Sequence, residues 1–373
     1  MNRRFYQLNK NYKNIIMNSK KIKNSVKLFY RIQKYFLVFL FSIILPFTTL
    51  QASYTGYLAE YFKDFKELTV IELQGGLSNS KNYKITTKEK DYVLRILNPN
   101  TSIEERRQEI AAATYAGELE IGPHIFHVDP NYEAIIMDFV KGETLNPSLL
   151  KDKKVLIACL QCIQRLHRST GNFPQGLTVF ERIKLQLKNL KQSEIPVPIE
   201  AIDNALVKLC NIEKIFNNHA LVPCHNDLNA LNVILDGTTV KFIDWTDSGM
   251  GYAYNELGYF VLVNQIEEER YDEVLESYLG AMPSVQETYL LKLMKKINTL
   301  RIFASNFPAY EPPILDLDQR KIRSMHLENL LWDPNLLPVS YFIDLHIKGK
   351  LCGQELVVMS ALSSLRSFLS DDL

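Results

Sequence analysis

The sequence predicts an α+β fold of two lobes, in which a small antiparallel sheet with one helix precedes a larger, mainly helical lobe. Three observations lead to this prediction. Five short stretches rich in Val, Ile and Tyr lie before residue 140, and they flank a single helical pattern. Long helical patterns dominate after Lys141-Gly142. Asp236-Gly237 separates two short β-type runs, which is a strong hairpin signal.

The bulk composition describes a folded protein of more than one unit. The chain has 373 residues and a formal net charge of +1, so it gives no case for nucleic-acid binding. Its five cysteines are odd in number and irregularly spaced, which argues against a disulfide framework and fits a reducing compartment. Cys159 and Cys162 form one C-x-x-C inside a helical pattern, and we interpret them as helix-face thiols rather than a redox or metal pair.

Residues 1–56 form a basic N-terminal extension with a hydrophobic segment at 35–52. Residues 1–34 hold ten Lys or Arg and no acidic residue, and no charge occurs from Tyr35 to Ala59. The apolar run is close to the minimum of about 17 residues that spans a bilayer, and its flanks resemble a signal peptide. Four interpretations of the segment 35–52 remain open: a signal peptide, a transmembrane helix, a mis-assigned start (Met17 would give a more ordinary one), and a hydrophobic extension that lies on a membrane or on the protein body.

The first lobe is expected at residues 57–140. The pattern at Leu58–Leu68 predicts a short amphipathic helix, and the stretch 102–119 predicts a longer one, with Ser102 as its cap and Glu105 at the capping-box position. A tight polar loop, Gly75-Gly76-Leu77-Ser78-Asn79, follows the first strand. The predicted strands are Leu68–Leu73, Asn82–Thr86, Tyr92–Leu97, Ile125–Val128 and Ala134–Phe139.

The second lobe is expected at residues 141–373, with a catalytic loop region at 222–251. Beyond its last long helix we expect an extended and partly irregular tail to Leu373. The predicted helices are 148–168, 177–192, 198–217, 254–280 and 285–305.

The residues that indicate chemistry lie between 222 and 251. His225-x-Asp227 is followed, after four intervening residues, by Asn232, and Asp244 comes a dozen residues further on. The hairpin between them would place Asn232 and Asp244 side by side at its open end. Phosphoryl transfer needs a carboxylate that orients the acceptor hydroxyl, here Asp227, and oxygen ligands for Mg²⁺, here Asn232 and Asp244. His225 is expected to hydrogen-bond the loop backbone.

At this point a resemblance can be stated. His225-Asn226-Asp227-Leu228, Asn232 and Ile243-Asp244-Trp245 resemble the signature of the choline/ethanolamine kinases and aminoglycoside phosphotransferases, and Asn226 is more similar to the choline kinase branch. The resemblance extends over roughly residues 65–345. It implies a bilobal, protein-kinase-like fold that uses ATP and Mg²⁺.

The resemblance also implies a nucleotide site in the first lobe. The loop residues Gly75, Gly76, Ser78 and Asn79 would cover the ATP phosphates. Arg95 stands where kinases place a phosphate-binding side chain, and Glu109 is its expected ion-pair partner, ahead of Glu105. The strand that contains Met137 resembles the hinge that binds adenine. One departure is Thr246, where relatives commonly have an acidic residue. Either Asp247 takes over a second-metal or substrate role, or the second metal site is weaker, and both alternatives stay open.

The resemblance implies a small alcohol as acceptor, choline or a related amino alcohol first. Thiamine, an aminoglycoside or another small alcohol remain alternatives, as do a membrane-tethered pseudokinase and a secreted or surface protein. Because ATP is cytoplasmic, we expect the kinase body there. Oligomeric state stays open. Quaternary ammonium groups bind aromatic faces and acidic groups. The candidates for such a site, each with core packing as its alternative, are Trp245, Tyr252, Tyr254, Trp332, Asp247 and Glu256.

Overall fold

The computed structural model describes residues 54–62, 68–73, 79–310 and 315–370. The chain divides into two compact units, residues 1–65 and 66–373. The described part of the first unit contains helix α3 (Thr55–Tyr61), which begins three residues before the predicted helix. The hydrophobic segment 35–52 lies outside the described residues. Among the helices within the described ranges, none is both long and apolar enough to cross a membrane.

The second unit begins with a five-stranded antiparallel sheet, as predicted. Its strand order is β1-β2-β3-β5-β4, and each strand lies within one or two residues of its predicted bounds. Buried side chains on the middle strands, such as Ile85 and Leu94, form its packed face. The strands are β1 (Thr69–Leu73), β2 (Lys81–Thr86), β3 (Asp91–Ile96), β4 (Ile125–Val128) and β5 (Ala134–Asp138).

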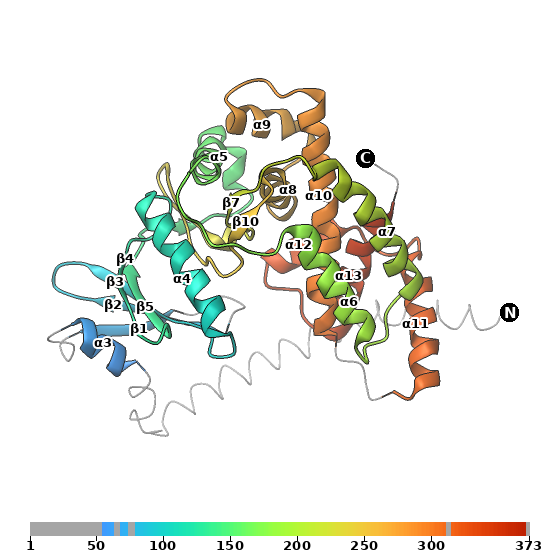
Figure 1. Ribbon diagram of the computed structural model, residues 1–373, viewed down its shortest axis with the longest axis horizontal. Coiled ribbons are helices and arrows are strands. Elements are labelled where there is room, and N and C mark those ends of the chain that lie inside the picture. The colour runs from blue at the N-terminus through green and yellow to red at the C-terminus, as the bar shows by residue number, and fades with distance from the viewer. Residues whose placement is uncertain (1–53, 63–67, 74–78, 311–314, 371–373) are drawn as a thin grey trace, which may run out of the picture. The chain divides into compact units, whose positions relative to one another are not determined.

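Helix α4 (Ile103–Glu118) lies beside this sheet (Figure 1). The predicted capping box is confirmed, because the Ser102 hydroxyl accepts the Glu105 N–H and the Glu105 carboxylate accepts the Ser102 N–H. Ile110 of the helix packs with Ile135 of β5 in one buried cluster. This packing fixes the position of α4 on the sheet, and α4 carries Glu109.

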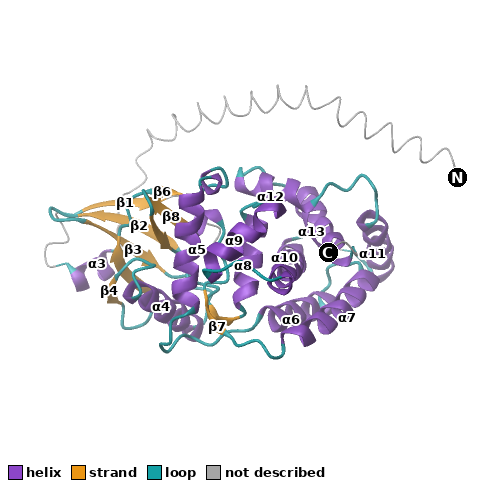
Figure 2. Cartoon of the chain, turned by 90° about the horizontal axis from the view of Figure 1, so that it is seen from above, coloured by secondary structure: helices purple, strands orange, loops and turns teal. Residues whose placement is uncertain are grey.

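The rest of the second unit is mainly helical, as predicted, and Figure 2 shows the sheet at one end with the helices beyond it. Three short pairings interrupt the helices: β6 (Glu143–Thr144) with β8 (Val233–Asp236), β8 with β9 (Thr239–Phe242), and β7 (Val222–Cys224) with β10 (Gly249–Gly251). The predicted hairpin turn is confirmed, with Gly237 at φ +61°. The helices are α5 (Lys153–His167), α6 (Val179–Gln192), α7 (Ile199–Phe216), α8 (Ala253–Val263), α9 (Tyr271–Leu279), α10 (Val285–Asn306), α11 (Leu317–Leu331), α12 (Val339–Ile347) and α13 (Gln354–Leu369).

Two predictions about this lobe are wrong. The single helix expected at 254–280 is two helices, because the chain turns at Gln265, a non-glycine residue with φ +53° that carries no breaker signal. The tail beyond residue 315 is not extended but forms α11, α12 and α13. Helix α13 buries Leu362, Leu365 and Phe368 in a core shared with α6, α7 and α10, so tertiary packing stabilises it.

The cysteine pair of α5 behaves as a packing feature. Cys159 is buried and Cys162 is half-buried, and both are free thiols. Burial raises the pKa of Cys159 to about 12, so its thiol stays protonated and is a poor nucleophile. The interpretation as helix-face thiols is confirmed.

Candidate active site

The catalytic loop lies between β7 and β8, and an internal hydrogen-bond network holds it. His225 is buried; its Nε2 contacts the Ile243 carbonyl at 2.9 Å, and its Nδ1 accepts the Asp227 N–H at 3.3 Å. Asn226 adopts a left-handed conformation with φ +64°, which Asn tolerates better than most residues. The expected backbone role of His225 is thus present in the structure.

Asp227 receives three hydrogen bonds on its carboxylate. Asn232 Nδ2 and Asn229 Nδ2 donate to Oδ2 at 2.8 and 3.1 Å, and the Tyr259 hydroxyl donates to Oδ1 at 2.6 Å. Burial raises the pKa of Asp227 above its ordinary value, and the Arg301 charge and the Tyr259 hydrogen bond oppose part of that rise. Burial and the neighbouring carboxylate raise the pKa of Tyr259 well above its ordinary value, so its hydroxyl stays a donor.

Asn232 and Asp244 meet at the open end of the β8–β9 hairpin. Asn232 directly precedes β8, Asp244 follows β9 by two residues, and the Ile243 N–H donates to the Asn232 carbonyl at 2.9 Å. The Asn232 amide nitrogen faces Asp227, donating to its backbone carbonyl at 2.9 Å as well as to its side chain. An amide oxygen and a carboxylate at this end form a donor set of the hard-oxygen type that suits Mg²⁺.

Arg95 connects the sheet to this hairpin. Its Nε donates to Glu109 Oε1 at 2.9 Å, and its Nη2 donates to Asp244 Oδ1 at 2.7 Å, so the expected ion pair with Glu109 is present. Thr246, at the position of the sequence departure, donates its hydroxyl to Asp244 Oδ1 at 2.7 Å. Burial alone would raise the pKa of Asp244, but Arg95 and Thr246 outweigh it and hold that pKa below its ordinary value.

The remaining nucleotide-site candidates are described in part. Gly75, Gly76 and Ser78 lie outside the described residues, and Asn79 is the first described residue after that gap. Met137 is half-buried on β5 and pairs with Val93 of β3. Beyond it, the Asp138 N–H donates to the His124 carbonyl at 2.9 Å. The adenine-binding role of this strand stays a prediction.

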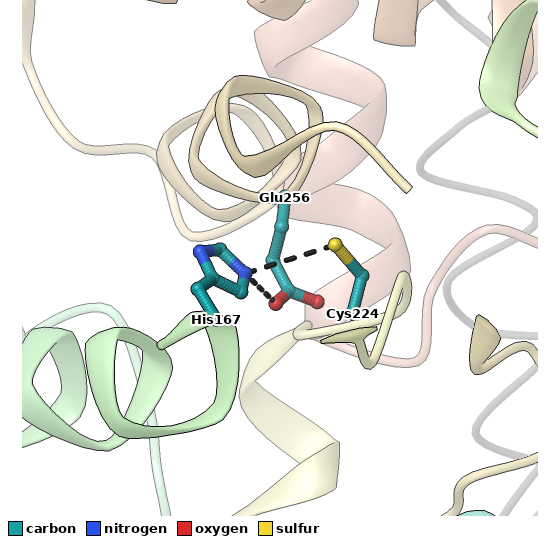
Figure 3. A group of neighbouring side chains, drawn as sticks. All are labelled: His167, Cys224 and Glu256. Atoms are coloured by element: carbon teal, nitrogen blue, oxygen red, sulfur yellow. Dashed lines mark hydrogen bonds and ion pairs between the residues drawn. The ribbon is translucent and has the colours of Figure 1, made fainter. Parts of the chain in front are cut away.

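The buried side chains of His167, Cys224 and Glu256 point toward one another (Figure 3). His167 Nε2 lies 2.6 Å from Glu256 Oε2 and 3.7 Å from Cys224 Sγ. The other Glu256 oxygen accepts the Asn226 N–H at 2.6 Å. The three ligand-type atoms lie within 4.8 Å of one another. Because the His167–Glu256 distance is that of a hydrogen bond and Glu256 also holds Asn226, we interpret the cluster as an anchor for the loop.

Two acceptor-site candidates are buried in the structure, which argues against direct substrate contact. Glu256 is fully buried in the anchor just described. Trp245 is 2% exposed; its indole N–H donates to the Phe242 carbonyl at 3.2 Å, and its ring packs on His225 with centroids 4.5 Å apart. These interactions occupy both side chains with the protein itself.

The other acceptor-site candidates do not converge. Tyr252 packs against Phe180 in the helical core, and Tyr254 is half-buried beside it. Trp332 is 56% exposed at the end of α11. Their substrate roles stay predictions. Asp247 is held by two ion pairs, with Arg182 and Arg301, which are described below.

Sequence reasoning missed Tyr259 and Arg301. Tyr259 lies three residues after Glu256 on α8, so the two share a helix face that meets the catalytic loop. Arg301 is a buried charge in a stretch of α10 whose neighbours Leu300 and Phe303 are core residues. A polar residue on an otherwise apolar helix face was the available signal, since buried charges need partners.

The comparisons with known proteins show the family of the chain. A family model described as "phosphotransferase enzyme family" matches residues 69–288, more than half of the chain. The chain belongs to this phosphotransferase family. Protein LicA of Haemophilus influenzae is 24% identical over 259 residues, which cover 68% of this chain and 74% of LicA. A LicA homolog of Metamycoplasma hominis is 29% identical over 160 residues, which cover 43% of this chain and 61% of the homolog.

The solved structures confirm the fold. The crystal structure of choline kinase LicA from Streptococcus pneumoniae matches with a TM-score of 0.54 and 20% identity over 74% of this chain and 96% of that chain. At this identity the likeness supports the protein-kinase-like fold alone. The predicted fold class and the predicted resemblance to choline kinases and aminoglycoside phosphotransferases are confirmed.

Proposed function

We propose that this phosphotransferase moves the γ-phosphate of ATP to the hydroxyl of a small molecule in a Mg²⁺-dependent reaction. The observation that carries the proposal is the convergence of Asp227, Asn232 and Asp244 at one hairpin end, with Arg95 beside them. Phosphoryl transfer needs mainly positioning and charge neutralisation, and these groups are suited to both.

Asp227 is the proposed catalytic base. The acceptor oxygen forms a new bond to the γ-phosphorus, the bond from that phosphorus to the bridging oxygen of ADP breaks, and ADP leaves with the electron pair. The acceptor's proton passes to Asp227, whose carboxylate the Asn229, Asn232 and Tyr259 side chains orient. An oriented base favours the transition state more than ground-state binding.

Asn232 and Asp244 are the proposed Mg²⁺ ligands. Because the Asn232 side-chain nitrogen already faces Asp227, the side-chain oxygen Oδ1 of Asn232 is the atom left for a cation, and the lowered pKa of Asp244 keeps the Asp244 carboxylate ionised. When bound, the ion neutralises phosphate charge. Arg95 is the proposed phosphate-binding side chain, and its ion pairs with Glu109 and Asp244 support this role by holding it beside the proposed metal ligand.

The acceptor in the first instance is an amino alcohol such as choline. LicA of Streptococcus pneumoniae is described as a choline kinase, and LicA relatives are the proteins most similar in sequence that we report. Thiamine, an aminoglycoside or another small alcohol is the alternative within the same reaction class. We further propose that the body acts in the cytoplasm, where ATP is abundant. Cell fractionation with an antibody to the chain tests that location.

The experiment is ATP consumption by the full chain with Mg²⁺ and a panel of choline, ethanolamine, thiamine and aminoglycosides, beside Asp227→Asn. We expect turnover of one acceptor, with kcat lowered in the variant far more than ATP affinity. A folded protein that binds Mg-ATP without turning over any acceptor would favour the pseudokinase alternative. A folded protein without nucleotide binding would refute the proposal.

A further inference from the structure

Arg301 is a buried arginine that touches both loops of the proposed active site. It lies on α10, and its side chain is 9% exposed. Nη1 donates to the Asn226 carbonyl at 2.6 Å, and Nη2 donates to Asp247 Oδ2 at 3.2 Å. One planar guanidinium therefore joins the residue before Asp227 to a residue three positions after Asp244.

The same guanidinium also contacts the proposed base through an aromatic ring. The Arg301 Cζ atom lies 4.5 Å from the centroid of the Tyr259 ring, and the Tyr259 hydroxyl donates to Asp227 at 2.6 Å. Tyr259 comes from α8, so α8 and α10 act on the base together. Two of the three contacts of Arg301 thus lead to Asp227, one through its backbone neighbour Asn226 and one through its side-chain partner Tyr259.

Asp247 is a shared partner in this arrangement. Arg182 of α6 donates to Asp247 Oδ1 at 3.0 Å, while Arg301 holds Oδ2. The Arg182 pair is more exposed, with side chains 28% and 39% accessible, and exposed pairs contribute little. The Asn226 side chain adds a bond from its Nδ2 to the Asp247 carbonyl at 3.3 Å. The two loops are consequently linked at Asp247 whether or not Arg182 is present.

We propose that Arg301 is a positioning residue that fixes the loop of the base, Asp227, relative to the loop of the metal ligand, Asp244. Its guanidinium group donates to both Asn226 and Asp247 and so connects the two loops. Lysine offers a point charge without two divergent N–H groups in one plane, so it does not reproduce both contacts in the geometry that Arg301 gives them. A purely structural arginine would stabilise the fold as a whole without a special effect on these two loops. The role in catalysis rests on the proposed function, whereas the bridging role does not.

The primary test needs no acceptor. Hydrogen exchange of the full-length wild type is compared with that of Arg301→Lys, Arg301→Gln, Arg182→Gln and Arg320→Gln. Arg320 lies on α11 and pairs with Glu194, which follows α6, so its variant serves as a control outside the two loops. We expect faster exchange in peptides covering 224–229 and 244–250 for both Arg301 variants. Peptides from the sheet and from α13 should be unchanged, and the Arg182 and Arg320 variants should resemble the wild type.

The second readout is kinetic, on the acceptor that the panel identifies. We expect Arg301→Lys to lower kcat about tenfold or more, with the KM for ATP within about twofold of the wild-type value. Millimolar guanidinium should restore part of the activity of Arg301→Gly, and methylammonium should not.

The outcomes separate cleanly. Uniform acceleration of exchange across the second unit, or no change in the two loop peptides, would overturn the bridging role. If Arg301→Gln fails to fold, Arg301→Lys decides the question, because lysine keeps the charge and the aliphatic chain. The Arg301 variants could exchange faster in the two loop peptides while the wild-type protein turns over no acceptor. That result would support the bridging role and count against the proposed function alone.

Discussion

Replacing Tyr259 with phenylalanine removes one hydroxyl and keeps the ring on which Arg301 stacks. That hydroxyl donates to Asp227 at 2.6 Å, a length typical of charge-assisted O–H···O⁻ bonds. Hydrogen bonds to charged groups contribute about 1.5–3 kcal/mol. Two amide donors remain on the other oxygen of Asp227, so we expect a loss in free energy of unfolding at the lower end, about 1.5–2 kcal/mol.

The same bond should matter for turnover. If its energy is retained in the transition state, its loss lowers kcat about tenfold, since roughly 1.4 kcal/mol corresponds to a factor of ten. Urea unfolding followed by circular dichroism measures the first effect, and steady-state phosphotransfer measures the second. The KM for ATP should stay near the wild-type value, because Tyr259 contacts the base and not Arg95.

The matched control is Tyr271→Phe. The Tyr271 hydroxyl is buried and has no hydrogen-bond partner within the described part of the chain, so its removal should leave the free energy of unfolding unchanged or slightly higher. If Tyr259→Phe were no less stable and no less active than Tyr271→Phe, the hydrogen bond to Asp227 would carry no energy. The reasoning about the orientation of the base would then be refuted.

Three further substitutions test other parts of the structure. Arg95→Lys should raise the KM for ATP about tenfold, because lysine lacks the planar guanidinium group that donates to Glu109 and Asp244 from two nitrogens. Isothermal titration calorimetry with a nonhydrolysable ATP analogue measures the affinity independently of turnover. Glu256→Gln should lower kcat with little change in nucleotide affinity, because the amide weakens the hold on the Asn226 N–H; equal losses in both quantities would contradict a loop-specific role. Ser102→Ala should lower the free energy of unfolding by about 1 kcal/mol at neutral pH. The hydrogen bonds from Ser102 hold the pKa of Glu105 below its ordinary value. The stability that they give is therefore present at a pH above the ordinary pKa and declines as the pH falls through the folded-state pKa. Urea titrations at neutral and acidic pH should show that the difference in free energy of unfolding between wild type and Ser102→Ala becomes smaller in acid.

Much of the fold was predictable because its signals are local. Short stretches rich in Val, Ile and Tyr predicted all five strands of the sheet, and Ser102 with Glu105 predicted the start of α4. The Asp236-Gly237 turn predicted that Asn232 and Asp244 would lie side by side. Each of these inferences depends on residues within a few positions of one another, where steric and hydrogen-bond preferences decide the conformation.

The errors arose where tertiary contacts decide the outcome. The C-terminal helices are separated by Pro338, Gly349 and Gly353, which read as loop signals, while the packing of α13 against α10 is invisible in the sequence. The acceptor-site candidates were chosen for residue type, and burial of Trp245 and Glu256 assigns these two side chains to the interior. Residue type predicts what chemistry a side chain can do, and not whether a ligand can reach it.

The proposed base also depends on both local sequence and tertiary contacts. Asn226 and Asp244 both have left-handed backbones, at φ +64° and +63°, a conformation that costs roughly 1 kcal/mol for a non-glycine residue. The Asn226 N–H donates to Glu256 and the Asn226 carbonyl accepts from Arg301, and hydrogen bonds to such charged groups contribute about 1.5–3 kcal/mol each. Those two contacts outweigh the strain, so the loop is held in a conformation that it would not adopt alone. The motif supplies the reacting groups, and helices α8 and α10, which carry no motif, hold them in position.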